Sequence, residues 1–371
     1  LRQWPEFEDP DYRRICSWPL TSQEIKGRFL LRLSRMLQDH PAARIISPQQ
    51  AQEVVPLATP AAFTGSGSVD QQRAIAGIIR TATGHRRRPL VIEADRGRGK
   101  SAALGQAAAA LLGRPSGSCR HILVTAPSLH AVETLFEHAG KALAGFHAST
   151  GKLEHGDLWL RFIAPDHLPG EGQDADLLLV DEAAAIPAPL LETLLRRHAR
   201  IVFATTVHGY EGTGRGFATR FRDTLDRLTP QWRELRLSTP IRWGDNDPLE
   251  RLSFDALLMD AEPAADHAFA GFNLGQLEIE RISQDALLQD EGTLRELFGL
   301  LVLAHYRTRP FDLRHLLDGA NVEIVVGRYK AAIAAVAVAV REGGFDAHMR
   351  TRILSGKRRP HGHLAPQTLA L

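Results

Sequence analysis

The sequence predicts an α/β protein whose core is a mostly parallel sheet covered by helices on both faces. Two observations support this prediction. From Val69 onward, short runs that are apolar along their whole length alternate with segments of helical periodicity, a pattern typical of sheets buried on both sides. A glycine-rich loop with a lysine follows one of these runs and opens a helix, which is the context of a phosphate-binding loop. Strands are expected at 89–94, 121–125, 158–164, 176–180, 200–205 and 234–238, and helices at 101–112, 128–143, 188–198 and 216–228.

The two ends of the chain differ from this central region. Residues 1 to about 60 show no alternation of strands and helices, and their clearest element is an amphipathic helix at 25–37. A stretch rich in Gly and Ser ends at 64–68 and has the composition of a linker. Beyond Asp285 we expect helices at 293–306 and 311–317 and strands at 322–327 and 332–341. The expected parts are an N-terminal helical and linker segment at 1–64, an ATPase domain at 65–280 and a third domain at 281–371.

Composition narrows the class of protein. The 371 residues include 45 Lys and Arg against 43 Asp and Glu, with 24% charged and 44% hydrophobic residues, which excludes wholesale disorder. Two cysteines, Cys16 and Cys119, exclude a disulfide scaffold. The most apolar run, 331–340, is much shorter than the roughly twenty residues of a membrane span. No signal peptide opens the chain, so we expect a cytoplasmic protein, and Leu1 in place of Met leads us to expect an excerpt of a longer chain.

Arginines gather in clusters such as 86–88, and a further basic run stands at 357–359. The planar guanidinium group donates paired hydrogen bonds to phosphate, so these clusters are candidates for nucleic-acid contact. An ordinary solvated surface is the alternative, since groups of three basic residues are common on exposed faces.

The strongest functional signal is the segment 94–101 (ADRGRGKS). It matches the P-loop template G-x-x-x-x-G-K-[ST], except that Ala94 stands at the first glycine. In such a loop, backbone N–H groups surround phosphate oxygens and the helix dipole favours their negative charge. Lys100 is expected to reach the β- and γ-phosphates, and the Ser101 hydroxyl to hold Mg²⁺.

A second signal is the apolar strand that ends in Asp181 and Glu182. In a Walker B motif, Asp181 would bind Mg²⁺ through water and Glu182 would activate the attacking water. Two carboxylates after a strand also describe an ordinary helix N-terminus. Their position about eighty residues after a P-loop favours the catalytic interpretation.

Weaker candidates lie where an ATPase would need them. Gln71, upstream of the P-loop, is placed like the adenine-reading glutamine of helicases, although a glutamine on a helix surface is the alternative. Thr205 and Thr206 end the next strand, where a hydroxyl can sense the γ-phosphate, and Arg242 follows the last strand and could stabilise developing charge. The glycine-rich loop 208–217 allows close approach of a ligand or RNA, or is a mobile turn. For His361 and His363 we favour a loop or RNA-facing role over metal binding, because no third ligand is near in sequence.

Several motifs together resemble the bacterial tRNA(Met) cytidine acetyltransferase family, and the resemblance covers nearly the whole chain. The motifs that carry it, in order, are 95–101 (DRGRGKS), 180–187 (VDEAAAIP), 209–217 (GYEGTGRGF), 240–243 (PIRW), 304–308 (AHYRT) and 358–364 (RRPHGHL).

The resemblance implies a RecA-like, helicase-related P-loop ATPase domain followed by the N-terminal half of a GNAT-type acetyltransferase domain at 281–371. Members of the family consume ATP and acetyl-CoA and N4-acetylate the wobble cytidine of elongator tRNA(Met). The expected partner is therefore tRNA, with no DNA and no membrane. By the resemblance, Lys100, Asp181, Glu182 and Arg242 serve ATP hydrolysis, and Ser101 and Asp181 hold Mg²⁺. The ATP-binding residues would be Gln71, Gly97, Arg98, Gly99, Lys100, Ser101, Ala102 and Arg242.

One expected motif is missing. GNAT domains bind the pyrophosphate of acetyl-CoA with an Arg/Gln-x-x-Gly-x-Gly loop at a helix start, and no such segment occurs after Asp285. We therefore expect a truncated acetyltransferase that binds acetyl-CoA weakly or not at all. Two alternatives are a helicase-like, RNA-stimulated ATPase that remodels RNA without acetyl transfer, and a non-catalytic RNA-binding module with a nucleotide switch. A translocating helicase needs two RecA-like lobes, and the sequence contains one P-loop and one Walker B motif.

Overall fold

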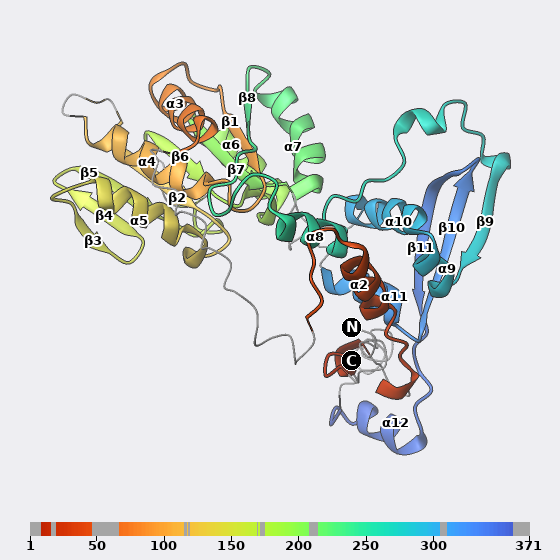
Figure 1. Ribbon diagram of the computed structural model, residues 1–371. Coiled ribbons are helices and arrows are strands. Elements are labelled where there is room, and N and C mark those ends of the chain that lie inside the picture. Colours follow the sequence, from red (N-terminus) through yellow and green to blue (C-terminus); the bar gives the residue numbers. More distant parts are fainter. Residues whose placement is uncertain are drawn as a thin grey trace. The chain divides into compact units, whose positions relative to one another are not determined.

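The computed structural model describes residues 9–15, 20–46, 67–114, 117, 119–168, 170, 175–207, 214–304 and 310–358. These residues form two compact units (Figure 1). The ATPase unit, as we call it, contains the described residues of Pro56–Asp247, and the second unit contains those before Val55 and from Pro248 onward. None of the described helices is long and apolar enough to cross a membrane.

The ATPase unit is built on an eight-stranded sheet in the order β3-β4-β5-β2-β6-β7-β1-β8. From β5 to β8 all neighbouring strands are parallel, which confirms the prediction of a mostly parallel sheet. The parallel strands are β1 (Leu90–Ala94), β2 (His121–Thr125), β5 (Leu158–Phe162), β6 (Leu177–Val180), β7 (Ile201–Thr206) and β8 (Arg233–Leu237). The sequence analysis missed the antiparallel hairpin of β3 (His147–Ser149) and β4 (Lys152–His155), whose strands are too short to show a period.

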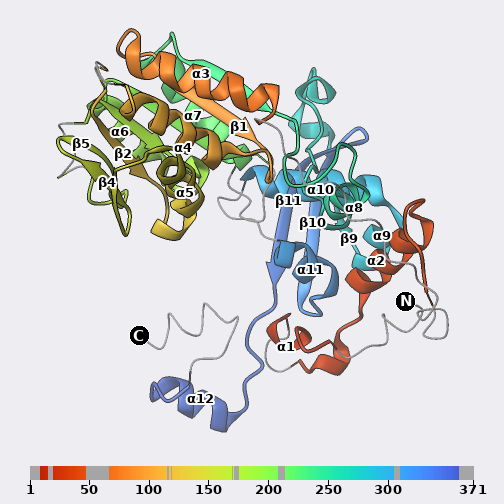
Figure 2. The same cartoon turned by 60° about the vertical axis from the view of Figure 1, so that its left-hand side comes forward.

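Helices cover both faces of this sheet, as the apolar strands require (Figure 2). One face packs on α3 (Val69–Thr83), α4 (Lys100–Leu112) and α5 (Glu133–Ala142), the last preceded by η4 (Leu129–Val132). The other face packs on α6 (Ala188–Arg197) and α7 (Gly214–Leu228). Small residues bring α4 close to α5: a Cβ added at Gly105 would lie 2.3 Å from the Leu135 carbonyl oxygen. The small residues of α4 thus allow the P-loop helix to pack closely against α5.

The second unit contains a three-stranded antiparallel sheet in the order β11-β10-β9 and a set of helices. The strands are β9 (Leu277–Ile282), β10 (Val322–Tyr329) and β11 (Ala332–Val340). The helices are α1 (Tyr12–Ile15), α2 (Arg28–Asp39), α8 (Pro248–Leu257), α9 (Gln284–Gln289), α10 (Glu291–Ala304), α11 (Pro310–Asp318) and α12 (Ala347–Leu354), with short 3-10 turns η2 (Ser22–Glu24), η6 (Asp266–Phe269) and η7 (Leu274–Gln276).

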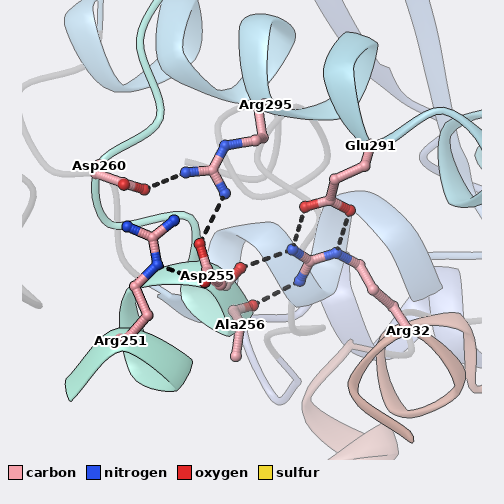
Figure 3. A network of polar contacts seen from close by, with 7 residues as sticks. All are labelled: Arg32, Arg251, Asp255, Ala256, Asp260, Glu291 and Arg295. Atoms are coloured by element: carbon pink, nitrogen blue, oxygen red, sulfur yellow. Dashed lines mark hydrogen bonds and ion pairs between the residues drawn. The ribbon is translucent and has the colours of Figure 1, made fainter. Parts of the chain in front are cut away.

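A buried arginine ties the N-terminal helix α2 into this unit. Arg32 is 4% exposed, and its guanidinium donates to the Glu291 carboxylate and to the carbonyls of Asp255 and Ala256, at 2.7 and 2.6 Å (Figure 3). Beside it, Arg295 pairs with Asp255 and Asp260. The sequence could not show these partners, because they lie more than 200 residues from Arg32.

The compact units do not follow the segment limits expected from the sequence. Described residues before Val55 pack with the C-terminal half of the chain, and residues 248–280 do so too, although the sequence grouped them with the ATPase. Helix α8 carries the backbone carbonyls that receive Arg32, and Gly299 of α10 lies against the backbone of Glu262. Packing between segments distant in sequence therefore determines these limits.

Candidate functional site

The candidate site lies at the carboxyl ends of three parallel strands of the ATPase unit. The loop after β1 carries Lys100, and Asp181 and Glu182 follow β6. The strand between them is β7, whose last residue is Thr206. Because carboxyl ends of parallel strands share one edge, the sheet order alone brings these groups together.

The P-loop turns at two glycines in the left-handed region, Gly97 (φ 75°) and Gly99 (φ 80°). The chain after β8 covers this loop, with Ile241 donating its N–H to the Gly97 carbonyl at 2.8 Å. A Cβ at Gly97 would stand 2.6 Å from the Trp243 ring, and a Cβ at Gly99 would stand 2.4 Å from the Ile241 side chain. Glycine is therefore required at both positions by conformation and by space. Helix α4 begins at Lys100 directly behind them, so its first N–H groups face the loop as in a phosphate site.

The departure from the P-loop template is accommodated without strain. Ala94 is the last residue of β1, is 1% exposed and pairs with Thr206. It is not among the residues with positive φ. A side chain is tolerated there because the turn begins after this position.

Lys100 is buried within a small polar network. Its Nζ donates to Thr206 Oγ1 at 2.8 Å and lies 3.9 Å from Glu182 Oε1. The Thr206 hydroxyl in turn donates to Glu182 Oε2 at 2.9 Å. Of the two threonines selected from the sequence, Thr206 thus joins the P-loop lysine to the second carboxylate. The Thr205 hydroxyl is buried without a hydrogen-bond partner in the described part of the chain.

Glu182 has a strained backbone. Its φ is 48°, a left-handed value that costs a non-glycine residue on the order of 1–3 kcal/mol. The conformation begins the 3-10 turn η5 (Ala183–Ala185) and leaves the carboxylate near Thr206 and Lys100. Such strain is found where surrounding structure enforces a functional geometry.

Asp181 is fully buried and incompletely satisfied. Its Oδ1 accepts the Glu182 N–H at 2.9 Å, but Oδ2 has no hydrogen-bond partner among the described residues. Burial, and after it the charge of the neighbouring Glu182, raise the pKa of Asp181 to about 6 against the opposing effects of the Ser101 side chain and Lys100. A buried carboxylate oxygen without a donor is costly unless a cation binds it. The donor set of a carboxylate and a hydroxyl fits Mg²⁺, which prefers oxygen ligands.

Gln71 contacts the loop directly, whereas Arg242 lies between two residues that do. Gln71, 3% exposed in the first turn of α3, donates through Nε2 to the Gly99 carbonyl at 3.3 Å. Arg242 is exposed between Ile241 and Trp243, both of which contact the loop glycines. Arg98 is buried at 8% exposure with its guanidinium 5.7 Å from the Trp243 ring centroid, and Ala102 is buried in the first turn of α4.

Asp70, which was not a candidate from the sequence, connects the segment that carries Gln71 to the segment that carries Arg242. Its Oδ2 accepts the backbone N–H groups and the hydroxyls of Ser238 and Thr239, at 3.0 to 3.2 Å. These hydrogen bonds hold the end of β8 to the start of α3 and keep the pKa of Asp70 low. The partners are 168 and 169 residues away, so only the fold reveals the role. Trp243 is a further residue of this site, because its ring packs against Gly97.

Two other sequence candidates lie outside the described residues. The glycine-rich loop 208–217 is described only from Gly214, where α7 begins, and His361 and His363 fall in the undescribed C-terminal stretch. Within the described ranges, no group of three or more His, Cys, Asp or Glu is arranged to hold a metal ion.

A parallel sheet with a lysine-bearing glycine loop after β1 and a carboxylate pair after β6 defines a P-loop ATPase fold of the RecA-like class. Residues 91–260 match the family described as RNA cytidine acetyltransferase NAT10/TcmA, helicase domain. Across its whole length the chain is 50% identical to the tRNA(Met) cytidine acetyltransferase TmcA of Nitrosococcus halophilus, of which it spans 51%. The chain belongs to the TmcA-like RNA cytidine acetyltransferase family.

Further relatives give the same result. The chain is 44% identical to TmcA of Vibrio cholerae, over 81% of this chain and 42% of that protein. It is 36% identical to TmcA of Haloferax volcanii, over 96% and 50%. The chain thus spans about half the length of the curated relatives it matches. Among solved structures, the large terminase of bacteriophage D6E overlaps with a TM-score of 0.39 at 12% identity, over 52% of this chain and 50% of that chain.

Proposed function

We propose that the chain binds and hydrolyses ATP with Mg²⁺, as the ATPase part of an RNA cytidine N4-acetyltransferase acting on the wobble cytidine of elongator tRNA(Met). The observation that carries the ATPase proposal is the orphaned Oδ2 of Asp181, buried beside the P-loop helix and the Lys100 network. An uncompensated carboxylate next to a phosphate-binding loop fits a cation that accompanies phosphates. The substrate class follows from the names of the relatives.

In this proposal each residue has a defined role. The backbone N–H groups from Gly97 to Ser101 bind phosphate oxygens, and Lys100 turns from Thr206 toward the β- and γ-phosphates. Ser101 and Asp181 would hold Mg²⁺, which would neutralise phosphate charge. Glu182, held by Thr206, orients the attacking water and accepts its proton. Arg242 stabilises charge on the γ-phosphate, and Gln71 reads the base.

The acetyltransferase part of the proposed function concerns the second unit. Residues 281–371 would be the N-terminal half of a GNAT-type domain, with β10 and β11 as its central hairpin. No Arg/Gln-x-x-Gly-x-Gly segment occurs after Asp285, and such a loop would supply the N–H groups for the acetyl-CoA pyrophosphate. We therefore expect acetyl-CoA to bind this chain weakly at most. The alternative function is an RNA-stimulated ATPase that remodels RNA without acetyl transfer.

The test measures ATP hydrolysis and acetyl transfer separately on the same chain. Asp181→Asn keeps the size of the side chain but removes its charge, so Mg²⁺-dependent hydrolysis should be lost while the variant stays folded. Hydrolysis by Asp181→Asn at the wild-type rate would contradict the site assignment. Labelled acetyl-CoA with a tRNA transcript is the second measurement. Hydrolysis stimulated by tRNA without acetyl incorporation would favour the remodelling ATPase.

A further inference from the structure

The edge of the parallel sheet opposite the candidate site collects arginines from four separate segments, one of which is the last turn of α3 with Arg80. Arg86, Arg87 and Arg88 form the turn before β1, Arg200 stands immediately before β7, and Arg233 is the first residue of β8. Backbone hydrogen bonds hold the starts of β1, β7 and β8 side by side. The Arg87 N–H donates to the Ala199 carbonyl at 2.7 Å, and the Arg233 N–H donates to the Pro89 carbonyl at 2.9 Å. We call Arg80, Arg86, Arg87, Arg88, Arg200 and Arg233 the amino-edge arginine cluster.

The side chains of this cluster are oriented by neutral oxygens. Arg200 Nη2 donates to the Gly84 carbonyl at 3.2 Å, and Arg233 Nη2 donates to Thr81 Oγ1 at 3.1 Å. The Nε atoms of both are buried without a hydrogen-bond partner among the described residues. Arg80 and the arginines at 86–88 are exposed.

The cluster has no internal counter-charge. Within the described ranges, no carboxylate forms an ion pair with any of its six guanidinium groups, whereas other arginines of the same unit are paired. Asp176, on the neighbouring strand start, accepts the backbone N–H groups of Arg120 and His121. Burial lowers the pKa of Arg233, and the charges of Arg80 and Arg88 lower it further. Repulsion between these arginines therefore raises the free energy of the folded protein, and a bound anion would lower it.

We propose that the amino-edge arginine cluster is a surface that binds the phosphate backbone of RNA. Guanidinium groups suit phosphates because their planar fork donates two hydrogen bonds at once. Contacts of this kind position the nucleic acid without reading its bases. The inference deepens the proposed function, on which it rests for the choice of RNA over an acidic protein.

The surface is separate from the nucleotide site. The two lie at opposite ends of β1, a strand of five residues that spans roughly 17 Å. RNA on the cluster and a nucleotide at the P-loop can therefore be bound together, with β1 and α3 joining the two sites.

The test compares two triple variants that remove the same charge. The first, Arg86→Gln with Arg87→Gln and Arg88→Gln, disrupts the exposed part of the cluster. The control, Arg120→Gln with Arg196→Gln and Arg227→Gln, removes arginines that are paired with Asp157 and Glu192. Affinity for a tRNA transcript is measured at salt concentrations from roughly 50 to 200 mM. The cluster variant should bind about tenfold more weakly at low salt, and its slope of log affinity against log salt should fall by about two.

Each outcome decides the proposal. The control variant should change the affinity by less than about threefold, since exposed paired arginines interact weakly with other anions. Equal losses in both variants, or no loss in the cluster variant, would overturn the assignment. Retained RNA binding with lost binding to a polyglutamate peptide would instead assign the cluster to an acidic protein. A wild-type chain that binds no tRNA would count against the proposed function itself. Hydrolysis without RNA should be unchanged in both variants, which shows that they are folded.

Discussion

Two buried charged side chains, one from each unit, are satisfied differently. In the second unit, Arg32 is surrounded by the Glu291 carboxylate and two carbonyls, so its donors are occupied from several helices. In the ATPase unit, Asp181 is equally buried yet leaves Oδ2 without a partner. Asp318 of the second unit also has an Oδ2 without a hydrogen bond, but the Arg314 Nε lies 3.8 Å from it. Asp181 differs because its unpartnered oxygen lies beside a phosphate-binding loop, where a cation can bind it.

The largest effect should come from Lys100. Lys100→Ala removes the charge aimed at the phosphates, so ATP hydrolysis should fall at least about a thousandfold. The free energy of unfolding should change little by comparison, since Thr206 and Glu182 retain each other. Steady-state hydrolysis and a denaturant titration check both parts. A folded variant that hydrolyses ATP at a near-normal rate would show that Lys100, contrary to our proposal, has no functional role that distinguishes it from Arg32.

For Arg32 we expect the opposite result, a loss of stability without a loss of ATP binding. Arg32→Ala leaves two backbone carbonyls and the half-exposed Glu291 carboxylate without their donor, which should cost about 1–3 kcal/mol of stability. Affinity of the folded fraction for ATP should not change. Arg251→Ala is the matched control, because Arg251 is exposed and pairs with Asp255 in the same network, and it should cost less than about 1 kcal/mol. Equal losses in the two variants would show that burial does not determine the contribution.

Glu182 tests whether the strained residue acts on water. Glu182→Gln keeps the shape and the hydrogen bond from Thr206 but cannot accept a proton, so hydrolysis should slow about a hundredfold while ATP still binds. Nucleotide affinity measured by calorimetry separates the two effects. A parallel loss of affinity and turnover would point to a structural role.

Glu93 is buried with partners that only partly satisfy it, and its substitution should give the smallest effect. It is buried in β1, and its pKa is raised to about 7 by burial, by a hydrogen bond with Glu234 and by the charge of Glu234, while Arg222 and Arg236 oppose the shift. A carboxyl with a raised pKa binds its proton more tightly in the folded state, so its contribution to stability is lost as pH rises from about 4.5 to about 7. Glu93→Gln should therefore be more stable than wild type at pH 8, on the order of 1–3 kcal/mol, with the difference disappearing near pH 4. Denaturant titrations across this range provide the measurement, and a constant difference would exclude the titration of Glu93 as its cause.

The sequence predicted the ATPase unit well because its signals are local. Most of the parallel strands are apolar runs, although β8 alternates charged and apolar residues, and the P-loop and the strand before Asp181 are contiguous motifs. The sequence predicted the rest less well because the decisive contacts are distant. Asp70 acquires its role only when β8 lies beside α3, and Arg32 only when α2 meets α8 and α10. No periodicity reports such pairs.

Trp243 gives the molecule a built-in optical reporter. Its indole ring packs over Gly97 and within 5.7 Å of the Arg98 guanidinium. The emission of an indole depends on the charges and water around it, and any rearrangement of this loop alters both. Of the five tryptophans, Trp243 alone among those described contacts the P-loop glycines. A change in intrinsic fluorescence that Trp243→Phe abolishes would therefore follow the loop directly, without a label.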